Sequence, residues 1–111
     1  MPMPRWLPGV LRKIRSLAEE GKVRFTLKAL REMASLGFGL DESDACDILQ
    51  RLRAADFQER IASETTGEWM VVFVPRIAGA GLYLKVILRA ECVVVSLHEQ
   101  VDHEQAEEEH H

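Results

Sequence analysis

Residues 82–98, LYLKVILRAECVVVSLH, decide the fold of this chain. Apolar and polar side chains alternate over residues 82–89, and a run rich in β-branched residues follows the Ala90-Glu91 pair. A period of two predicts a strand with one face on a core, and two such runs across a short polar break predict a β-hairpin. We therefore expect antiparallel strands at residues 82–88 and 92–98.

The length of the hairpin turn sets which side chains face one another. A two-residue turn at 90–91, or a four-residue loop with the same centre, gives one register, whereas a three-residue loop would shift it by one and place His98 on the opposite face. The cross-strand pairs predicted for the two-residue turn are Tyr83 with His98, Lys85 with Ser96 and Ile87 with Val94. Tyr83, Lys85 and His98 then share one face.

Two further runs before the hairpin also predict strands. Residues 69–74, WMVVFV, are apolar on both faces, as expected for a strand in the sheet interior that is covered on both sides. Pro75 closes this run, and residues 79–81 provide glycines for the chain to turn back. A weaker run at 57–62 is a candidate partner for the strand at 69–74.

The first half of the chain has the periodicity of amphipathic helices. Apolar residues recur at helical spacing from Pro8 to a stop at Gly21, and a second helix should begin after Thr26 as N-cap. Asp41, followed by Asp44, predicts a capped third helix up to about residue 52. A short extended piece at 22–25 separates the first two helices. The predicted class is α+β, with N-terminal helices packed on a C-terminal antiparallel sheet.

The charge of the chain is unevenly distributed. The net charge is −4, but residues 101–111 hold five acids and no Lys or Arg, while the rest carries 14 bases and 13 acids. Residues 5–31 alone contain eight bases and two acids. We expect one domain over residues 1–100 and an acidic, disordered tail over 101–111. A polyanion could dock on the N-terminal part, because local potential steers binding more than total charge does.

Several classes of protein are poorly supported by the sequence. No apolar run is long enough to span a membrane and no signal peptide is evident, so we expect a cytoplasmic protein. Cys46 and Cys92 lie in separate periodic runs without metal-ligand spacing, which predicts two reduced, buried thiols. The sequence lacks GxxxxGK, GxGxxG, HExxH and GxSxG motifs. We predict neither a metal site nor a cofactor.

The polar face of the hairpin has the residue types that metal-independent RNA cleavage needs. In that reaction a 2′-hydroxyl loses a proton, a 5′-oxygen gains one, and cations hold a pentacoordinate phosphate. His98 can exchange protons near neutral pH, and Tyr83 can donate one or stack on a base. Lys85, Arg76 or Arg89 can supply positive charge. Each of these side chains could equally be an ordinary solvated group, so composition alone leaves the function open.

Five separated segments, in order, resemble the MqsR (motility quorum-sensing regulator) family of toxins over about residues 8–99. The segments are Gly21-Lys22-Val23-Arg24-Phe25-Thr26, Asp56-Phe57, Glu68-Trp69 leading to Val74-Pro75-Arg76, Leu82-Tyr83-Leu84-Lys85-Val86, and Val93-Val94-Val95-Ser96. The resemblance implies a RelE-like fold and an endoribonuclease that cleaves mRNA next to GC-containing triplets. It also implies a protein antitoxin with a zinc-binding domain and a helix-turn-helix domain. The toxin would then be brought to DNA only by this antitoxin.

The resemblance also carries over residue by residue to the family's active positions. The strand tyrosine of the family falls on Tyr83. The lysine after the Asp-Phe pair falls on Glu59, with Arg60 beside it, and the glutamine after the tryptophan falls on Met70. The last lysine falls on His98, which could shift the chemistry toward proton transfer or remove activity.

The first hypothesis is a type II toxin that cleaves mRNA. Its catalytic residues would be Tyr83, His98 and Lys85, and its RNA-binding residues would be Arg76, Arg60, Lys28 and Arg31. The alternative is a catalytically weakened binding module of the same fold that engages an antitoxin-like partner, or an operon co-regulator. A direct DNA-binding regulator is least supported, because no helix-turn-helix pattern precedes the sheet.

Overall fold

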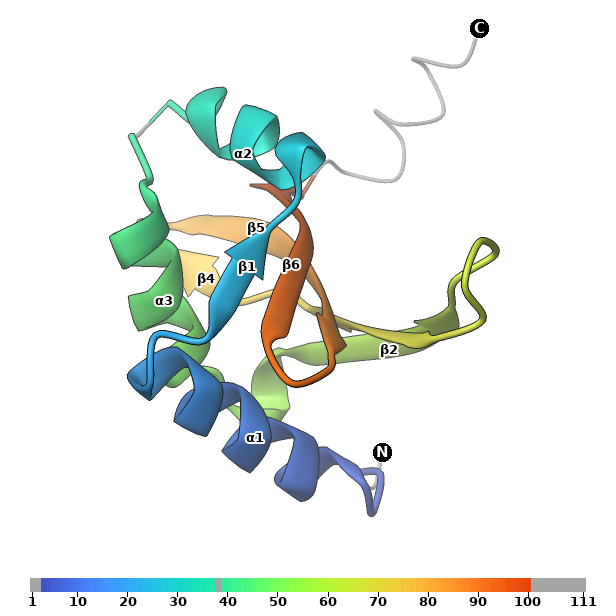
Figure 1. Ribbon diagram of the computed structural model, residues 1–111. Coiled ribbons are helices and arrows are strands. Elements are labelled where there is room, and N and C mark those ends of the chain that lie inside the picture. The colour runs from blue at the N-terminus through green and yellow to red at the C-terminus, as the bar shows by residue number, and fades with distance from the viewer. Residues whose placement is uncertain (1–2, 38, 101–111) are drawn as a thin grey trace, which may run out of the picture.

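The computed structural model describes residues 3–37 and 39–100, and within them an α+β fold (Figure 1). The helices are α1 (Leu7–Glu19), α2 (Leu27–Ala34) and α3 (Glu42–Gln50), followed by a short 3-10 turn, η1 (Ala54–Asp56). The strands are β1 (Val23–Phe25), β2 (Phe57–Ala62), β3 (Trp69–Phe73), β4 (Arg76–Ile77), β5 (Ala80–Leu88) and β6 (Cys92–Glu99). The tail predicted for residues 101–111 lies outside the described residues.

Residues at the start of each helix explain where the helix begins. Pro8 stands in the first turn of α1, where its missing N–H costs nothing. The Thr26 hydroxyl caps α2 by accepting a hydrogen bond from the Ala29 N–H, 3.0 Å away. Asp41 and Asp44 form a reciprocal capping box at the start of α3. All three helix predictions are confirmed, and no helix of the described residues is long and apolar enough to cross a membrane.

The strands of the described residues form a mixed sheet in the order β1-β6-β5-β3-β2, with β4 paired to β5 alone. Only β1, which runs parallel to β6, departs from antiparallel pairing. The predicted α+β class is confirmed, and the arrangement is consistent with the RelE-like one that the resemblance implies. β2, the weaker sequence run, is the edge strand on one side.

One face of the sheet packs on the helices and the other does not. In Figure 1, α1 and α3 lie on one side of the strands, and α2 lies at the end of β6. The core joins apolar side chains of all three helices to one face of β3, β5 and β6. Its most buried members are Leu7, Ile14, Ala29, Leu49, Leu52, Phe73, Leu82, Leu84, Val86, Cys92, Val94 and Leu97. No helix of the described part of the chain crosses the opposite face. We call that opposite face the open face.

The hairpin register differs from the two-residue-turn prediction near the turn and agrees with it farther away. Ile87 pairs with Val93, not Val94, because the connection is shifted by one residue. An irregularity between Lys85 and Val86 restores the register, consistent with one extra residue in β6 at Val95. The predicted pair of Tyr83 with His98 is therefore formed, although the turn that predicted it is not. Without this bulge His98 would point to the helices.

Two other details depart from the sequence reading. The short strand β4 was not predicted; it returns to β5 through a tight turn in which Ala78 and Gly79 both have positive φ, 52° and 82°. Such a pair fits a two-residue hairpin turn that matches the sheet twist. In the run at 69–74, Val72 on the open face and Phe73 on the helix face are both 0% exposed, but Trp69 is 54% exposed. Cys92 is buried and Cys46 half-buried, and both are free thiols.

Candidate functional site

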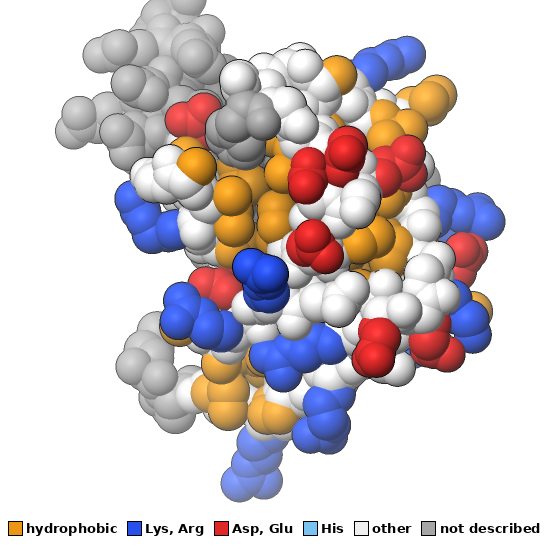
Figure 2. Space-filling model, turned by 90° about the vertical axis from the view of Figure 1, so that its left-hand side faces the viewer, with side chains coloured by type: hydrophobic (Ala, Val, Ile, Leu, Met, Phe, Trp, Pro, Cys, Tyr) orange, Lys and Arg blue, Asp and Glu red, His pale blue; other side chains and the backbone are white. Residues whose placement is uncertain are grey.

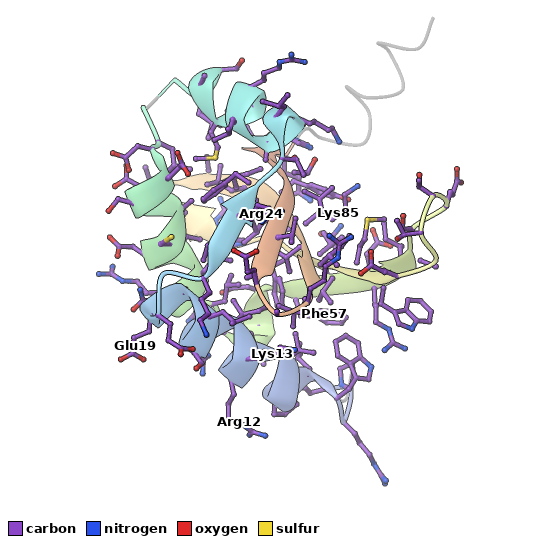
Figure 3. All side chains as sticks on the ribbon, viewed as in Figure 1. Arg12, Lys13, Glu19, Arg24, Phe57 and Lys85 are labelled. Atoms are coloured by element: carbon purple, nitrogen blue, oxygen red, sulfur yellow. The ribbon has the colours of Figure 1, made fainter. Side chains whose placement is uncertain are left out.

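The open face brings together the three side chains predicted to be catalytic. Tyr83 and His98, on β5 and β6, stack with ring centroids 4.9 Å apart and an interplanar angle of 14°. The Lys85 Nζ lies 6.0 Å from the Tyr83 ring centroid. All three are half-buried, and Figure 3 shows Lys85 on the side of β6 away from α1 and α3. We call Tyr83, Lys85 and His98 the hairpin patch.

Helix α2 adds a second cation to the hairpin patch. β1 pairs with β6 only as far as Val94, and α2 then runs beside the rest of β6. Lys28 reaches over this edge and donates a hydrogen bond from Nζ to the Ser96 hydroxyl at 3.0 Å. Ser96 stands opposite Lys85, so Lys28 and Lys85 flank the same point of the face. Two ammonium groups beside an imidazole and a phenol are suited to hold a phosphate.

Glu32, also on α2, fixes the strand end that carries His98. Its Oε1 accepts a hydrogen bond from the Leu97 backbone N–H at 3.0 Å, and its Oε2 lies 3.9 Å from His98 Nε2. His98 Nδ1 lies 2.9 Å from the Glu99 carbonyl oxygen, which can only accept, so Nδ1 carries the hydrogen. That leaves Nε2 as the nitrogen that can gain or lose a proton.

Burial and nearby charges shift the pKa values of Tyr83 and Lys85, the two other titratable groups of the hairpin patch. Burial raises the pKa of the Tyr83 hydroxyl, and the negative charges of Glu59 and Glu32 raise it further. Tyr83 is thereby kept protonated and able to donate. Burial lowers the pKa of the Lys85 ammonium, and the charge of Lys28 lowers it further, against the opposing carboxylates of Glu32 and Glu59. Lys85 is thus a better proton donor than an exposed lysine.

Arg31 lies beside the hairpin patch. It lines a shallow hollow of about 300 Å³ with Glu32, Ser35 and Leu36 of the α2 region and with His98. The structure therefore places Arg31 beside His98 and Lys28 beside Ser96, at the edge of the hairpin patch.

Arg76 is not brought to the hairpin patch. It lies on β4 and donates a hydrogen bond to the Gly79 carbonyl oxygen at 3.2 Å. It lines a larger hollow of about 720 Å³ together with residues of α3 and η1.

Figure 2, viewed from the side of α3, shows hydrophobic side chains between acidic groups, with Lys and Arg side chains gathered lower down toward α1.

Arg60 lies on the other face of the sheet. Glu59 stands opposite Val72 and Arg60 opposite Val71, whose side chain is in the core, so Arg60 points to the helix side. Its guanidinium lies over the rings of Trp6 and Trp69. Of the residues predicted to bind RNA, only Lys28 and Arg31 join the patch.

Sequence reasoning missed three polar groups around the patch. Glu32 and Ser96 were not proposed for any role, and Glu59 was noted only as a replaced lysine. The pairing of Ser96 with Lys85 was predicted, which could have drawn attention to its hydroxyl. The contacts of Glu32 had no sequence signal, because they depend on how α2 docks beside β6 across 65 residues of chain.

The mostly antiparallel sheet with helices packed on one face is consistent with the RelE-like arrangement of small toxins. Residues 9–99 match the family described as "Motility quorum-sensing regulator, toxin of MqsA". The chain belongs to this family, because the match covers most of its length.

A curated relative gives the match a functional name. The chain is 29% identical over 91 residues to the mRNA interferase toxin MqsR of Escherichia coli (strain K12), covering 81% of this chain and 91% of that protein. The resemblance drawn from the five sequence segments is thereby confirmed at the level of the family.

Proposed function

We propose that this protein is the toxin of a type II toxin-antitoxin system and acts as an endoribonuclease on mRNA. The observation that carries the proposal is the stacked pair of Tyr83 and His98 beside Lys85 on the open face. The family match and the name of the Escherichia coli relative support it. The cytoplasm, where mRNA is found, is the corresponding location.

The reaction can be divided among the residues of the hairpin patch without a metal. His98 Nε2 accepts the proton of the 2′-hydroxyl, which then attacks the adjacent phosphorus. The bond from phosphorus to the 5′-oxygen breaks, and Tyr83 or Lys85 donates a proton to that leaving oxygen. Lys28 and Lys85 stabilise the negative charge of the pentacoordinate phosphate. The products would be a 2′,3′-cyclic phosphate and a 5′-hydroxyl end.

A direct test is cleavage of a single-stranded mRNA fragment by purified protein in the presence of a metal chelator. Cleavage with a 5′-hydroxyl product is the expected result, and general acid-base groups typically contribute about 10²- to 10⁴-fold. His98→Ala should lose about that much rate. Tyr83→Phe, which keeps the stacked ring, should lose rate without losing RNA affinity if the hydroxyl donates. Intact RNA with the parent protein would contradict the proposal.

The finer specificity and the partner rest on the family resemblance alone. We propose cleavage next to GC-containing triplets, which end-mapping of the cut RNA would test. The proposed partner is an antitoxin with a zinc-binding and a helix-turn-helix domain, and DNA would be bound only through that complex. Co-purification with the product of the adjacent gene and relief of growth arrest by it would test this.

A specific observation favours a second candidate, a binding module with weakened catalysis. Glu59 and Glu32 both raise the pKa of Tyr83, so two carboxylates bring negative charge to the hairpin patch. Negative charge there opposes an RNA phosphate. Stable complex formation with the antitoxin, no growth arrest on expression and no RNA cleavage would identify this second function.

A further inference from the structure

A second group of planar side chains lies on the helix side of the β2–β3 hairpin. The Arg60 guanidinium carbon lies 4.5 Å from the Trp6 ring centroid and 4.1 Å from the Trp69 ring centroid, so the cation is held between two indoles. Trp6 in turn meets Phe57 edge to face at 5.3 Å, and Phe57 meets the buried Phe73 at 6.2 Å. The stack is therefore anchored in the core at one end.

The other end of this stack is exposed. Trp69 is 54% exposed, although large aromatic side chains are usually mostly buried. Arg60 is exposed as well, and no carboxylate of the described residues lies within 4.0 Å of it. We call Arg60 and Trp69 the indole–guanidinium platform. It offers solvent an aromatic ring and an uncompensated cation side by side.

Positive charge leads from helix α1 toward this platform. Arg5, Arg12 and Lys13 are exposed, and none forms an ion pair with a described residue. The acids of the same segment, Glu19 and Glu20, stand at the far end of the helix. Arg12 extends from the side of α1 that faces away from the sheet (Figure 3).

We propose that the indole–guanidinium platform binds single-stranded RNA outside the cleavage site. One base stacks on the free side of the Trp69 ring, and a neighbouring phosphate pairs with the Arg60 guanidinium. Aromatic rings next to a cationic track are how proteins hold single strands without reading sequence. The uncompensated charges of Arg60 and α1 favour a polyanion over a neutral protein surface. This inference rests on the proposed function, because it extends the path of the same substrate.

The sheet provides a short path between the two sites. Lys85, Val72 and Glu59 lie in register across β5, β3 and β2, so the edge of the sheet is two strand spacings, about 10 Å, from the hairpin patch. Beyond Glu59 the next residue of the edge strand is Arg60, on the other face. An RNA strand that leaves the patch across β2 and turns over this edge arrives at the platform.

The test is the affinity of labelled oligoadenylate, measured by fluorescence polarisation with the full chain. Oligoadenylate is single-stranded and lacks the GC-containing triplet, so binding is measured without cleavage. Trp69→Ala should weaken binding roughly 5- to 100-fold, as for loss of one stacked base, and Trp69→Phe should keep most of it. Arg60→Gln should reduce the slope of log affinity against log salt by about one unit. Arg51→Gln, at an exposed arginine just after the end of α3, is the charge-matched control.

The outcomes separate this inference from the proposed function. Parent-like affinity and salt slope in Trp69→Ala and Arg60→Gln would overturn the platform, even where the parent cleaves mRNA. Parent-like RNA binding together with lost antitoxin binding would also overturn it and assign the surface to a protein partner. Weakened binding in both variants, with thermal melting unchanged, supports it whether or not cleavage is found.

Discussion

Removing the Glu32 carboxylate should destabilise the protein through the edge of β6. Glu32 supplies the acceptor for the N–H of Leu97, a residue with 0% exposure, at a point where β1 has already ended. An unsatisfied buried N–H costs about 1–3 kcal/mol, and a hydrogen bond to a charged acceptor contributes a similar amount. We expect Glu32→Ala to lose about 2 kcal/mol, and Glu32→Gln, which keeps an acceptor oxygen, about 1 kcal/mol.

The assay for this prediction is thermal unfolding followed by circular dichroism. For a domain of this size each kcal/mol lowers Tm by about 4–8 °C, so the two variants should melt at clearly different temperatures. Hydrogen exchange of the Leu97 amide gives a local readout, since that amide should lose protection in Glu32→Ala first. The control is Glu19→Ala, an exposed carboxylate at the end of α1, which should stay within about 0.5 kcal/mol.

The melting temperatures of the two Glu32 variants, compared with the parent, show whether Glu32 stabilises β6 as a hydrogen-bond acceptor. Parent-like melting of Glu32→Ala, with the Leu97 amide still protected, would refute the role of Glu32 as the acceptor at this edge. Equal loss in Glu32→Ala and Glu32→Gln would show that the charge near His98, and not the hydrogen bond to Leu97, is what stabilises β6.

Three other perturbations give further predictions. Hydrogen bonds from Arg89 lower the pKa of the Glu68 carboxylate to about 2. The stability that this carboxylate contributes is therefore present above pH 4.5 and is lost as the pH falls toward 2. In Glu68→Gln the free energy of unfolding should depend less on pH over that range. Leu49→Ala, at a fully buried position, should cost about 2–5 kcal/mol in a denaturant titration, and a cost below 1 kcal/mol would contradict the packing of α3. Glu59→Gln removes a negative charge that acts on Tyr83 and Lys85. It should tighten RNA binding by roughly fivefold in a filter-binding assay. Weaker binding would argue against RNA on the open face.

The elements that the sequence predicted well are those encoded locally. Thr26 and Asp41 each cap a helix with their own side chain, so a few adjacent residues determine where α2 and α3 begin. The alternation over residues 82–89 likewise reports directly which side chains face the core. Because these signals need no distant contact, they can be read from the chain in isolation.

The features that were missed depend on contacts between distant segments. The connection after Leu88 shifts the pairing of Ile87, and the bulge in β6 then restores the register that places Tyr83 opposite His98. No residue of the turn indicates this bulge. The exposure of Trp69 follows from the β2–β3 hairpin extending beyond the helices, as Figure 1 shows, although the run itself looks like an interior strand. Arg60 was grouped with the patch because it is near Glu59 in sequence, yet adjacent strand residues point to opposite faces.

The contacts between α2 and β6 have a consequence for when the site exists during synthesis. Lys28 and Ser96 are 68 residues apart in the chain, and Glu32 and Leu97 are 65 apart. Helices and hairpins with local contacts form early, whereas such distant pairings require nearly the whole chain. A nascent chain that has completed α1, α2 and α3 still lacks the strand that carries His98. The candidate site is therefore complete only after the last strand, β6, has been synthesised, and under the proposed function this order would delay cleavage of the mRNA that is being translated.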